Sequence, residues 1–234
     1  MPASIYHGTV FAESRFIMSE KKSMKQKRFS LFDMTLCALF AAVICVLSPI
    51  SIQIGPIPVS LGLLGVLLAA SVLGPVRGMT SVLVFVLAGA CGLPVFSGGR
   101  GGFSVLIGPT GGYIWGYLSA PVIAGIRSDR IKTDSRNGKI IASLLSVVTC
   151  ITGTVICYFC GTVQYCFVAD IGFIAALAAC VIPFIPLDIL KCIFAGIFGT
   201  ELRRILHRAG FNPGKRYKDS SVRDEHAEAK VFRK

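Results

Sequence analysis

Two stretches of the chain are almost without charge, and apolar residues fill them. Residues 29–126 and 140–200 hold only six charged side chains between them: Asp33, Arg77, Arg100, Asp170, Asp188 and Lys191. Uncharged runs of this length cannot remain solvated, and a membrane-spanning helix needs about 20 mainly apolar residues. The pattern therefore predicts an all-α integral membrane protein embedded in a lipid bilayer.

Turn and proline signals divide these stretches into six transmembrane helices. We expect them near residues 31–50, 59–73, 79–93, 111–126, 140–169 and 171–200, the last interrupted by Pro183 and Pro186. Residues 50–58 are expected to form a short link, and Gly74–Gly78 ("GPVRG") a tight turn. The predicted domains are a basic cytoplasmic segment, the six-helix membrane domain and a charged cytoplasmic tail, at 1–29, 30–200 and 201–234.

Basic residues flank the apolar stretches rather than interrupt them. The chain has 24 Lys and Arg against 12 Asp and Glu, a net charge of +12, and the basic residues gather in tracts 21–28, 127–139 and 203–234. Cytoplasmic loops of membrane proteins carry such an excess. We therefore expect a multi-pass plasma-membrane protein with its N- and C-termini in the cytoplasm. Aromatic residues do not alternate with the basic ones as in nucleic-acid readers, so nucleic-acid binding is not expected.

Residues typical of metal or catalytic chemistry are scattered. Cys157 and Cys160 form a CxxC pair without a second pair or a nearby histidine, and the three histidines lie in the terminal segments. We interpret the cysteines as small buried side chains, and we expect no metal, no cofactor and no enzymatic activity. The sequence also contains no phosphate-binding GxxxxGK[ST] run, which argues against nucleotide binding.

Residues 94–113, "PVFSGGRGGFSVLIGPTGGY", are rich in glycine although they lie between two apolar runs. A solvated linker would not carry Phe96, Phe103 and Ile107 among its glycines. Non-helical backbone at membrane depth is tolerated where it is buried or lines a cavity, and glycine permits positive φ and close approach of a ligand. We interpret this glycine segment as one wall of a binding cavity; a flexible connection is the alternative.

Two opposite charges lie in the last predicted span. Asp188 and Lys191 are three residues apart and so share one helix face. A charged residue at the centre of a span costs roughly 2.5 to 3.5 kcal/mol on insertion scales, so such residues normally face the protein interior. Two roles are open for them, polar groups of a ligand site and a structural ion pair between helices.

Four motifs resemble the BioY family, the biotin-binding S components of energy-coupling factor (ECF) transporters. They are "PIPVSLGLLGVLLAASVLGPVRG", "GLPVFSGGRGG", "GPTGGYIWGY" and "PLDILK". The resemblance runs from about Leu31 to Gly199 and implies a six-helix fold with an outward-facing biotin pocket. It also implies high-affinity biotin uptake energised by a transmembrane coupling protein and two cytoplasmic ATPases. In one departure, this chain has Gly62 where the family often has a glutamine.

The resemblance further implies which residues contact biotin. The candidate ligand-binding residues are Asp188, Lys191, Phe96, Gly99, Gly101, Gly102, Thr110 and Tyr113, with Trp115 as a further aromatic wall and Arg100 left open. Asp188 is expected to accept hydrogen bonds from the N–H groups of the ureido ring. Ala38 and Ala42 form a small-xxx-small face. The resemblance assigns this face to docking on the coupling protein, and packing within the bundle is the alternative.

A second function fits the same residues less well. A self-sufficient secondary transporter of a small vitamin-like molecule could couple uptake to protons through Asp188. Such carriers usually contain two paired halves. This sequence shows no internal repeat, which favours the S component.

Overall fold

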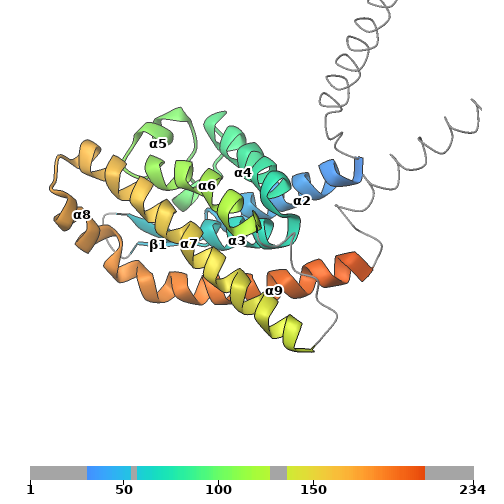
Figure 1. Cartoon of the computed structure of the whole chain (residues 1–234). Helices are drawn as coiled ribbons and strands as arrows, with labels where there is room; N and C mark the ends of the chain where they lie inside the picture. The colour runs from blue at the N-terminus through green and yellow to red at the C-terminus, as the bar shows by residue number, and fades with distance from the viewer. Residues whose placement is uncertain (1–30, 54–56, 127–135, 209–234) are drawn as a thin grey trace, which may run out of the picture.

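Helices dominate the protein, whose computed structural model describes residues 31–53, 57–126 and 136–208 (Figure 1). The elements in chain order are α2 (Leu31–Leu47), β1 (Ser51–Gln53), β2 (Pro58–Ser60), α3 (Gly62–Leu73), α4 (Pro75–Ala90), η1 (Ser97–Gly99), α5 (Phe103–Ile107), α6 (Gly111–Ile126), α7 (Arg136–Ala169), α8 (Phe173–Cys180), η2 (Ile182–Phe184) and α9 (Ile185–Arg208). The predicted segment 1–29, most of the basic tract 127–139 and most of the predicted tail lie outside the described residues.

Helix α3 lies at the centre of the helical body. It contacts α2, α4, α6, α7 and α9. Nearly all of its residues are buried, and its sequence, GLLGVLLAASVL, is apolar on every side, as expected for a helix surrounded by protein. Gly65 allows α2 to approach closely, because a Cβ at this position would lie 3.2 Å from the Ile44 side chain.

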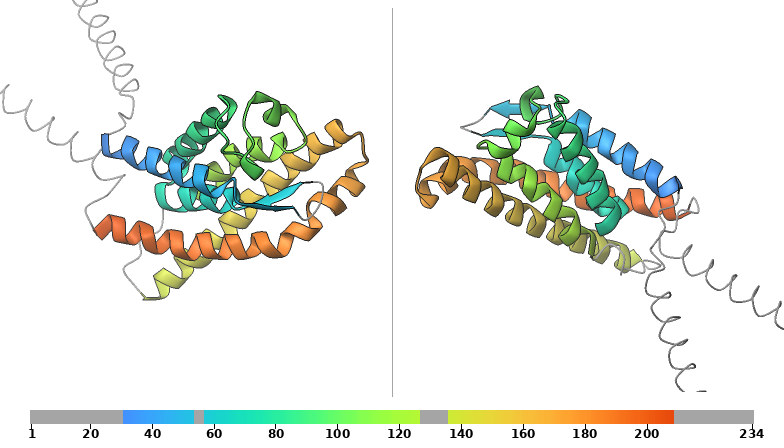
Figure 2. Two further views of the ribbon diagram at one scale, coloured as in Figure 1. Left: turned by 180° about the vertical axis from the view of Figure 1, so that it is seen from behind. Right: turned by 90° about the horizontal axis from the view of Figure 1, so that it is seen from above.

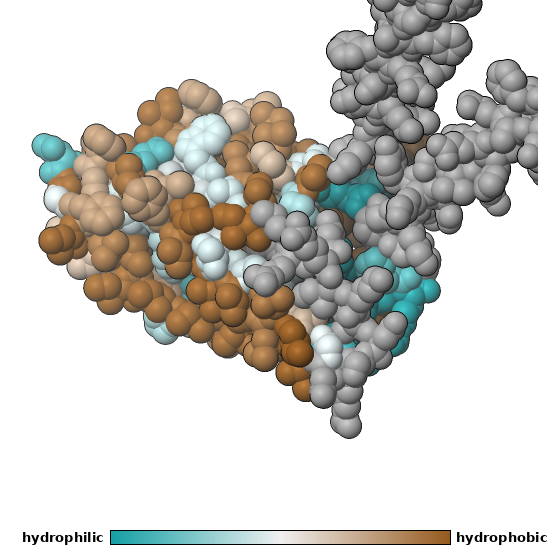
Figure 3. All heavy atoms as spheres, viewed as in Figure 1, coloured by the Kyte–Doolittle hydropathy of each residue, from teal (hydrophilic) through white to brown (hydrophobic). Residues whose placement is uncertain are grey.

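Many exposed residues of the helices are apolar, as they are on the lipid-facing surface of membrane proteins. Among the described residues, Gly138–Ala169 and Phe173–Arg208 are long and apolar enough to cross a bilayer, each with a mean hydropathy of 2.3 over an 18-residue stretch, whereas α2, α3 and α4 are apolar but shorter. Hydrophobic residues cover most of the face shown in Figure 3, and Leu144 and Phe159 on α7 are among the exposed ones. These are features of a helical membrane protein; the six crossings remain a prediction.

The helix ends expected in the cytoplasm gather at one end of the molecule. The start of α2, the start of α7 and the end of α9 lie together, opposite α8 (Figures 1 and 2). The same end carries the Asp33–Arg77 ion pair, in which Arg77 Nη2 is 3.1 Å from Asp33 Oδ2, and the Glu201–Arg204 pair. The most extensive hydrophilic surface in Figure 3 also lies there. The orientation of this end toward the cytoplasm remains a prediction.

The turn predicted at Gly74–Gly78 is confined to Gly74. This glycine has a φ of 82° and donates its N–H to the Ala70 carbonyl at 3.0 Å, which closes α3. Pro75 then opens α4, because the fixed φ of proline and its missing N–H suit the first turn of a helix. The prediction made the turn too long, since one glycine with positive φ is enough to separate the two helices.

The link predicted at residues 50–58 contains a β-hairpin, so the all-α expectation was incomplete. Strands β1 and β2 are antiparallel, with Ser51 opposite Ser60 and Gln53 opposite Pro58. At the open end of the hairpin, the Leu61 N–H donates to the carbonyl of residue 50 at 3.0 Å. Pairing of this kind satisfies backbone groups that would be costly to leave unpaired beside lipid.

The predicted sixth span is interrupted, as its prolines indicated. Helix α8 ends at Cys180, η2 follows, and α9 begins at Ile185. Pro183 and Pro186 have no N–H to donate, which favours a break in the helix here. Asp188 therefore lies in the first turn of α9 rather than at a helix centre. Helix α9 continues to Arg208, beyond residue 200 where we expected the membrane domain to end.

Candidate ligand-binding site

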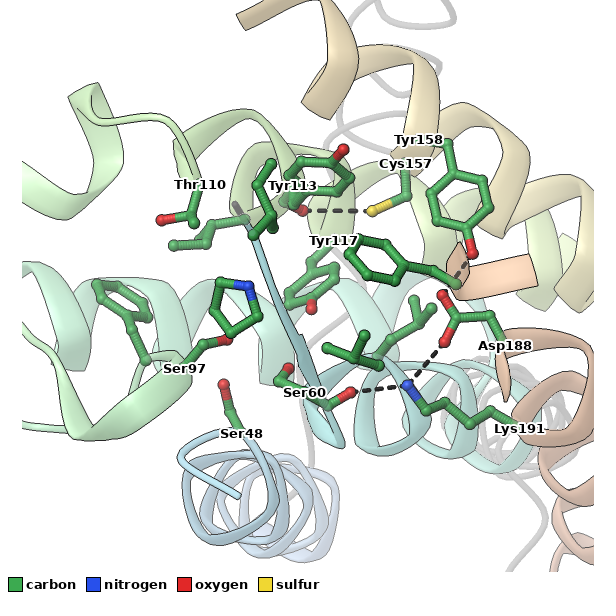
Figure 4. Close-up of a pocket in the computed structure, with 17 residues that line it drawn as sticks. Ser48, Ser60, Ser97, Thr110, Tyr113, Tyr117, Cys157, Tyr158, Asp188 and Lys191 are labelled. Atoms are coloured by element: carbon green, nitrogen blue, oxygen red, sulfur yellow. Dashed lines mark hydrogen bonds and ion pairs between the residues drawn. The ribbon is translucent and has the colours of Figure 1, made fainter. Parts of the chain in front are cut away.

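A cavity of about 50 Å³ lies among the hairpin, the glycine segment, α3, α6, α7 and the start of α9. Figure 4 shows its polar lining residues, which are Ser48, Ser60, Ser97, Thr110, Tyr113, Tyr117, Cys157, Tyr158, Asp188 and Lys191. The apolar lining includes Ile57, Leu63, Phe96 and Phe184. Ligand sites usually have about 300 to 1,000 Å³. A ligand of ordinary size therefore requires some lining groups to move.

Asp188 and Lys191 form an ion pair in the cavity wall (Figure 4). Lys191 Nζ is 2.7 Å from Asp188 Oδ1, and the two side chains are only 10% and 8% exposed. Their spacing places them on one face of α9, as the sequence predicted. At this distance the two buried charges compensate each other, whereas either one alone would be an unpaired charge in an apolar region.

Two further hydrogen bonds complete this polar cluster. Tyr158 Oη on α7 donates to Asp188 Oδ2 at 2.5 Å, so each carboxylate oxygen has a protein donor. Lys191 Nζ also donates to the Ser60 carbonyl at 2.9 Å, which ties α9 to β2. An ammonium group has three donors and a carboxylate about four lone-pair sites. Both groups therefore keep capacity to bind a ligand atom.

Phe96 is fixed at the cavity by α4. The side chain is 1% exposed and packs edge-to-face against Phe85, with ring centroids 5.6 Å apart and ring planes at 86°. Gly89 leaves room for it, because a Cβ at this position would lie 2.2 Å from Phe96 Cζ. Phe96 therefore lines the cavity, and its contact with a ligand remains a prediction.

Tyr113 and Thr110 line the cavity from the start of α6. Tyr113 Oη donates to the Cys180 carbonyl at 3.4 Å, and the Tyr113 ring lies against Gly161, where a Cβ would be 2.4 Å from the ring. The Cys157 thiol donates to the Tyr113 carbonyl at 3.3 Å. Thr110 is 8% exposed. Together with Phe96, Asp188 and Lys191, these two bring five of the predicted ligand residues to one cavity.

The three glycine candidates shape the backbone beside the cavity rather than line it. Gly99 and Gly102 have φ values of 70° and 98°, and the Gly102 N–H donates to the Gly89 carbonyl at 2.7 Å. A Cβ at Gly101 would lie 2.3 Å from the Leu93 carbonyl oxygen. The glycines thus permit the fold of the segment, and the structure does not bring them to the cavity wall.

Arg100 and Trp115 lie outside the cavity lining. Arg100 is exposed, and its Nε donates to the Ser97 carbonyl at 3.2 Å. Trp115 is 45% exposed, and its Nε1 donates to the Leu106 carbonyl at 3.3 Å. In a helix, residues four apart share a face and residues two apart do not. Tyr117, four residues after Tyr113, therefore lines the cavity where the sequence reading placed Trp115.

Several lining residues were missed by the sequence analysis. The helical repeat after Tyr113 is a signal that could have found Tyr117. Tyr158 lies between Cys157 and Cys160, and no local pattern marks it, because its partner Asp188 is on another helix. The hydroxyls of Ser48 and Ser60 surround position 62: the Gly62 N–H donates to Ser60 Oγ at 3.1 Å, and a Cβ there would lie 2.8 Å from Ser48 Oγ. No local pattern predicts these hydroxyls.

The cysteines make no disulfide. All nine are free, and within residues 31–53, 57–126 and 136–208 no three His, Cys, Asp or Glu side chains are placed to hold a metal ion. Cys157 acts as a hydrogen-bond donor in the cavity wall, as described above. Cys192 similarly lies within 3.3 Å of Thr154 Oγ1, so these thiols behave as small, weakly polar core residues.

The two alanines of the predicted docking motif lie on the outer face of α2. Both Ala38 and Ala42 are exposed. Ala42 belongs to a shallow, wholly apolar groove along this face, with Leu39, Val43, Val46 and Leu47. The buried face of α2, which packs on α3 and α4, consists of Leu36, Cys37, Phe40, Ala41 and Ile44. Packing inside the described part of the bundle therefore does not use the two alanines.

Known proteins resemble this chain over most of its length. The model of the BioY family matches residues 20–208. A biotin transporter BioY from Rhizobium etli is 36% identical over 173 residues, covering 73% of this chain and 92% of that protein. A probable biotin transporter BioY from Pyrococcus horikoshii is 35% identical, covering 73% and 96%. The crystal structure of the S-component for biotin from an ECF-type ABC transporter has 30% identity and a TM-score of 0.66, covering 74% and 92%.

Proposed function

This chain belongs to the BioY family, and on that premise we propose that it is the biotin-binding S component of an ECF transporter. It takes up biotin across the plasma membrane together with an energising module. That module consists of a transmembrane coupling protein and two cytoplasmic ATPases. The related proteins carry the names of biotin transporters, and none of the observations favours a self-sufficient secondary transporter.

The observation that carries the proposal is the polar cluster in an otherwise apolar and aromatic cavity. Biotin has an apolar bicyclic head with one ureido group, and a tail that ends in a carboxylate. Asp188 offers acceptor oxygens for ureido N–H groups, and Phe96 and Tyr113 offer flat surfaces for the rings. Few converging polar groups in an apolar pocket are the usual pattern of a small-molecule site.

Lys191 supports this arrangement in two ways. Its Nζ donates to Asp188 Oδ1 at 2.7 Å, which holds the carboxylate in place in the cavity wall. Its bond to the Ser60 carbonyl holds the β1–β2 hairpin over the cavity. We assign Lys191 to holding Asp188 and the hairpin in place, with its third N–H free to donate to the ligand.

We infer the orientation in the membrane from the helix ends that gather at one end of the molecule. The start of α2, the start of α7 and the end of α9 share one end of the molecule (Figure 2), and each is next to a basic tract of the sequence. The positive-inside rule supports a cytoplasmic location for this end. The cavity, bounded by the hairpin and the glycine segment, then opens toward the outer side. Biotin enters from there.

The energising partner docks on α2 in this proposal. The side chains of Ala38 and Ala42 are small, so another helix can approach the backbone of α2 closely here. The groove around Ala42 is wholly apolar. The chain itself contains no GxxxxGK[ST] phosphate loop. ATP hydrolysis must therefore come from a partner.

Equilibrium binding of labelled biotin to the purified protein tests the function. We expect saturable binding at one site, competed by unlabelled biotin. Lipoate, which has a carboxylate tail and a sulfur ring but no ureido group, is the matched control and should not compete. Absence of saturable binding by folded protein, or equal competition by lipoate, contradicts the proposed recognition of the ureido group.

Uptake measurements then separate the two kinds of transporter. We expect biotin uptake in cells that supply an ECF coupling protein and ATPases, and its loss when the ATPases carry inactivating substitutions. Uptake that is unaffected by those substitutions and collapses on adding a proton ionophore points to a secondary transporter instead.

A further inference from the structure

We propose that Gln164 is a positioning residue for the ligand cavity: it holds the turn that carries Thr110 into the cavity wall. The inference deepens the proposed function and rests on it for its binding readout. Gln164 lies on α7 but does not line the cavity. Its importance comes from what it binds on a neighbouring segment.

The side-chain amide of Gln164 uses its nitrogen twice. Nε2 donates to the Leu106 carbonyl at 2.9 Å and to the Gly108 carbonyl at 2.9 Å. A carboxamide NH₂ has two donors, so both are engaged by one short stretch of backbone. These carbonyls lie at the C-terminal end of α5, where helix carbonyls have no partner within the helix.

The bound stretch leads directly to Thr110. The Gly108 carbonyl also accepts the Gly111 N–H at 3.0 Å, which closes the turn from residue 108 to residue 111. Thr110 lies inside this turn, is 8% exposed and lines the cavity. Gln164 therefore fixes one end of the turn from which Thr110 projects.

Two glycines at the start of α6 leave room for the Gln164 side chain. A Cβ at Gly111 would lie 1.8 Å from the Leu106 carbonyl oxygen and 2.5 Å from Gln164 Nε2, and a Cβ at Gly112 would lie 2.8 Å from Gln164 Cβ. A side chain at Gly111 would overlap both the Leu106 carbonyl and the amide that binds it, and one at Gly112 would overlap α7 itself, where the Cys160 carbonyl oxygen lies 2.4 Å from the Cβ position. The two glycines of "GPTGGY" thus have a packing reason that involves Gln164.

The N-terminal end of α5 is held by a separate hydrogen bond. The Gly102 N–H donates to the Gly89 carbonyl on α4 at 2.7 Å. Helix α5 is thereby tied to α4 at its start and to α7 at its end. Phe96 precedes the first anchor and Thr110 follows the second, and both line the cavity. The anchors set the distance between these two parts of its wall.

Trp115 donates a hydrogen bond to the same Leu106 carbonyl and can serve as an intrinsic fluorescent probe. The Trp115 Nε1–H donates to the Leu106 carbonyl at 3.3 Å, and the chain has a single tryptophan. Its fluorescence therefore reports on the surroundings of Leu106 without any label. Loss of the Gln164 bonds changes those surroundings, so the emission of Trp115 should shift.

The test compares Gln164→Met with wild-type protein. Methionine keeps the length of the side chain and removes both donors. We expect biotin affinity to fall at least about tenfold, which corresponds to about 1.4 kcal/mol, together with a shift in Trp115 emission. Ser143→Ala is the matched control, because it removes a 3.1 Å bond between α7 and Thr200 on α9, away from the turn. It should change neither affinity nor emission.

A double-mutant comparison asks whether the effect passes through Thr110. In a Thr110→Val background, Gln164→Met should weaken binding clearly less than it does in wild-type protein, because coupled residues are not additive. An equal loss in both backgrounds overturns the proposal. So does unchanged affinity or unchanged Trp115 emission in folded Gln164→Met protein, even if its melting temperature falls.

A second variant covers the case in which Gln164→Met does not fold. Gln164→Glu keeps the shape and can donate at most one hydrogen, and the same readouts and criteria apply to it. If wild-type protein does not bind biotin, the proposed function fails. The emission comparison then still decides whether Gln164 holds the segment, since unchanged emission refutes it.

Discussion

Asp188 has a protein donor on each of its carboxylate oxygens, Lys191 on one and Tyr158 on the other. Such a cluster stabilises a charge that would otherwise be costly in an apolar cavity. It also orients the remaining lone pairs of the carboxylate. The same contacts would also stabilise a purely structural ion pair, and substitutions at Asp188 and Lys191 separate the two roles.

We predict a characteristic pattern for Asp188→Asn, Lys191→Met and the double variant. Removing one partner leaves an unpaired buried charge, which costs about 3 to 5 kcal/mol, whereas removing both can be nearly neutral. Each single variant should therefore lose thermal stability, and the double variant should regain it. Biotin binding should remain lost in the double variant, because the groups that recognise the ureido ring are gone.

Calorimetric binding and thermal unfolding of the four proteins check this pattern. Biotin affinity close to that of wild type in a folded double variant would show that the pair is structural. Recovery of stability without recovery of binding supports the ligand site.

At the residue scale, the sequence predicted the charged lining residues Asp188 and Lys191, but it missed Tyr117, Tyr158 and the serines of the lining. Asp188 and Lys191 were found because charge inside an apolar run is rare and demands a reason. The partner of Gly101 could not be named from the sequence, because its nearest neighbour is the Leu93 carbonyl, a backbone atom that carries no sequence signal. Tyr158 was missed for a related reason: its partner lies 30 residues away on another helix.

Among the elements, the glycine segment connects α4, α5 and α6 through backbone contacts. We predict that Gly101→Val destabilises the protein by about 1 to 3 kcal/mol, since overpacking a filled site carries this cost, and that it abolishes biotin binding. The Cβ at this position would lie 2.3 Å from the Leu93 carbonyl oxygen. Thermal unfolding and equilibrium binding measure the two effects.

Gly172→Ala is the matched control for that substitution. Gly172 has a φ of −63°, and a Cβ there meets no atom within 4 Å. Stability and binding should both stay near wild type. If Gly101→Val behaves like Gly172→Ala, the segment is a tolerant connection and not a wall of the cavity.

For α2, we predict that Ala42→Trp blocks assembly with the coupling protein and leaves biotin binding intact. A large ring on this face prevents close approach of a partner helix. Val148→Trp on α7 is the control, because Val148 is also an exposed apolar residue, at 57%, on a different helix. Co-purification with the tagged coupling protein checks both. Normal assembly of Ala42→Trp places the docking surface elsewhere.

Helix positions were largely predictable, and the connections were not. The helix expected over 111–126 has those bounds in the structure, because an uninterrupted apolar run leaves few alternatives. The hairpin at β1 and β2 was missed, since three-residue strands give too short an alternation to recognise. The start of α4 was misplaced because the conformation of a single glycine, Gly74, decided it.

For the whole molecule, orientation in the membrane can be tested with a native cysteine. Cys91 follows α4 near the glycine segment, and it is the one cysteine of the described chain that is exposed. We predict that a membrane-impermeant maleimide added to intact cells labels Cys91 from outside, and that Cys91→Ser abolishes most of this labelling. Labelling that requires opened cells would place this end of the molecule in the cytoplasm and reverse the proposed topology.

The central helix has a consequence for how far the ligand must travel. Helix α3 has 12 residues, and at about 1.5 Å per residue it is roughly 18 Å long, against a hydrocarbon core of about 30 Å. Leu63 in the first turn of α3, and Ser60 at the end of β2 just before this helix, line the cavity. The cavity therefore lies beside the N-terminal end of this short helix, where a longer helix would have continued. In the proposed orientation, biotin binds part of the way through the bilayer before ATP is hydrolysed. The length of α3 then separates the bound biotin from the cytoplasmic side.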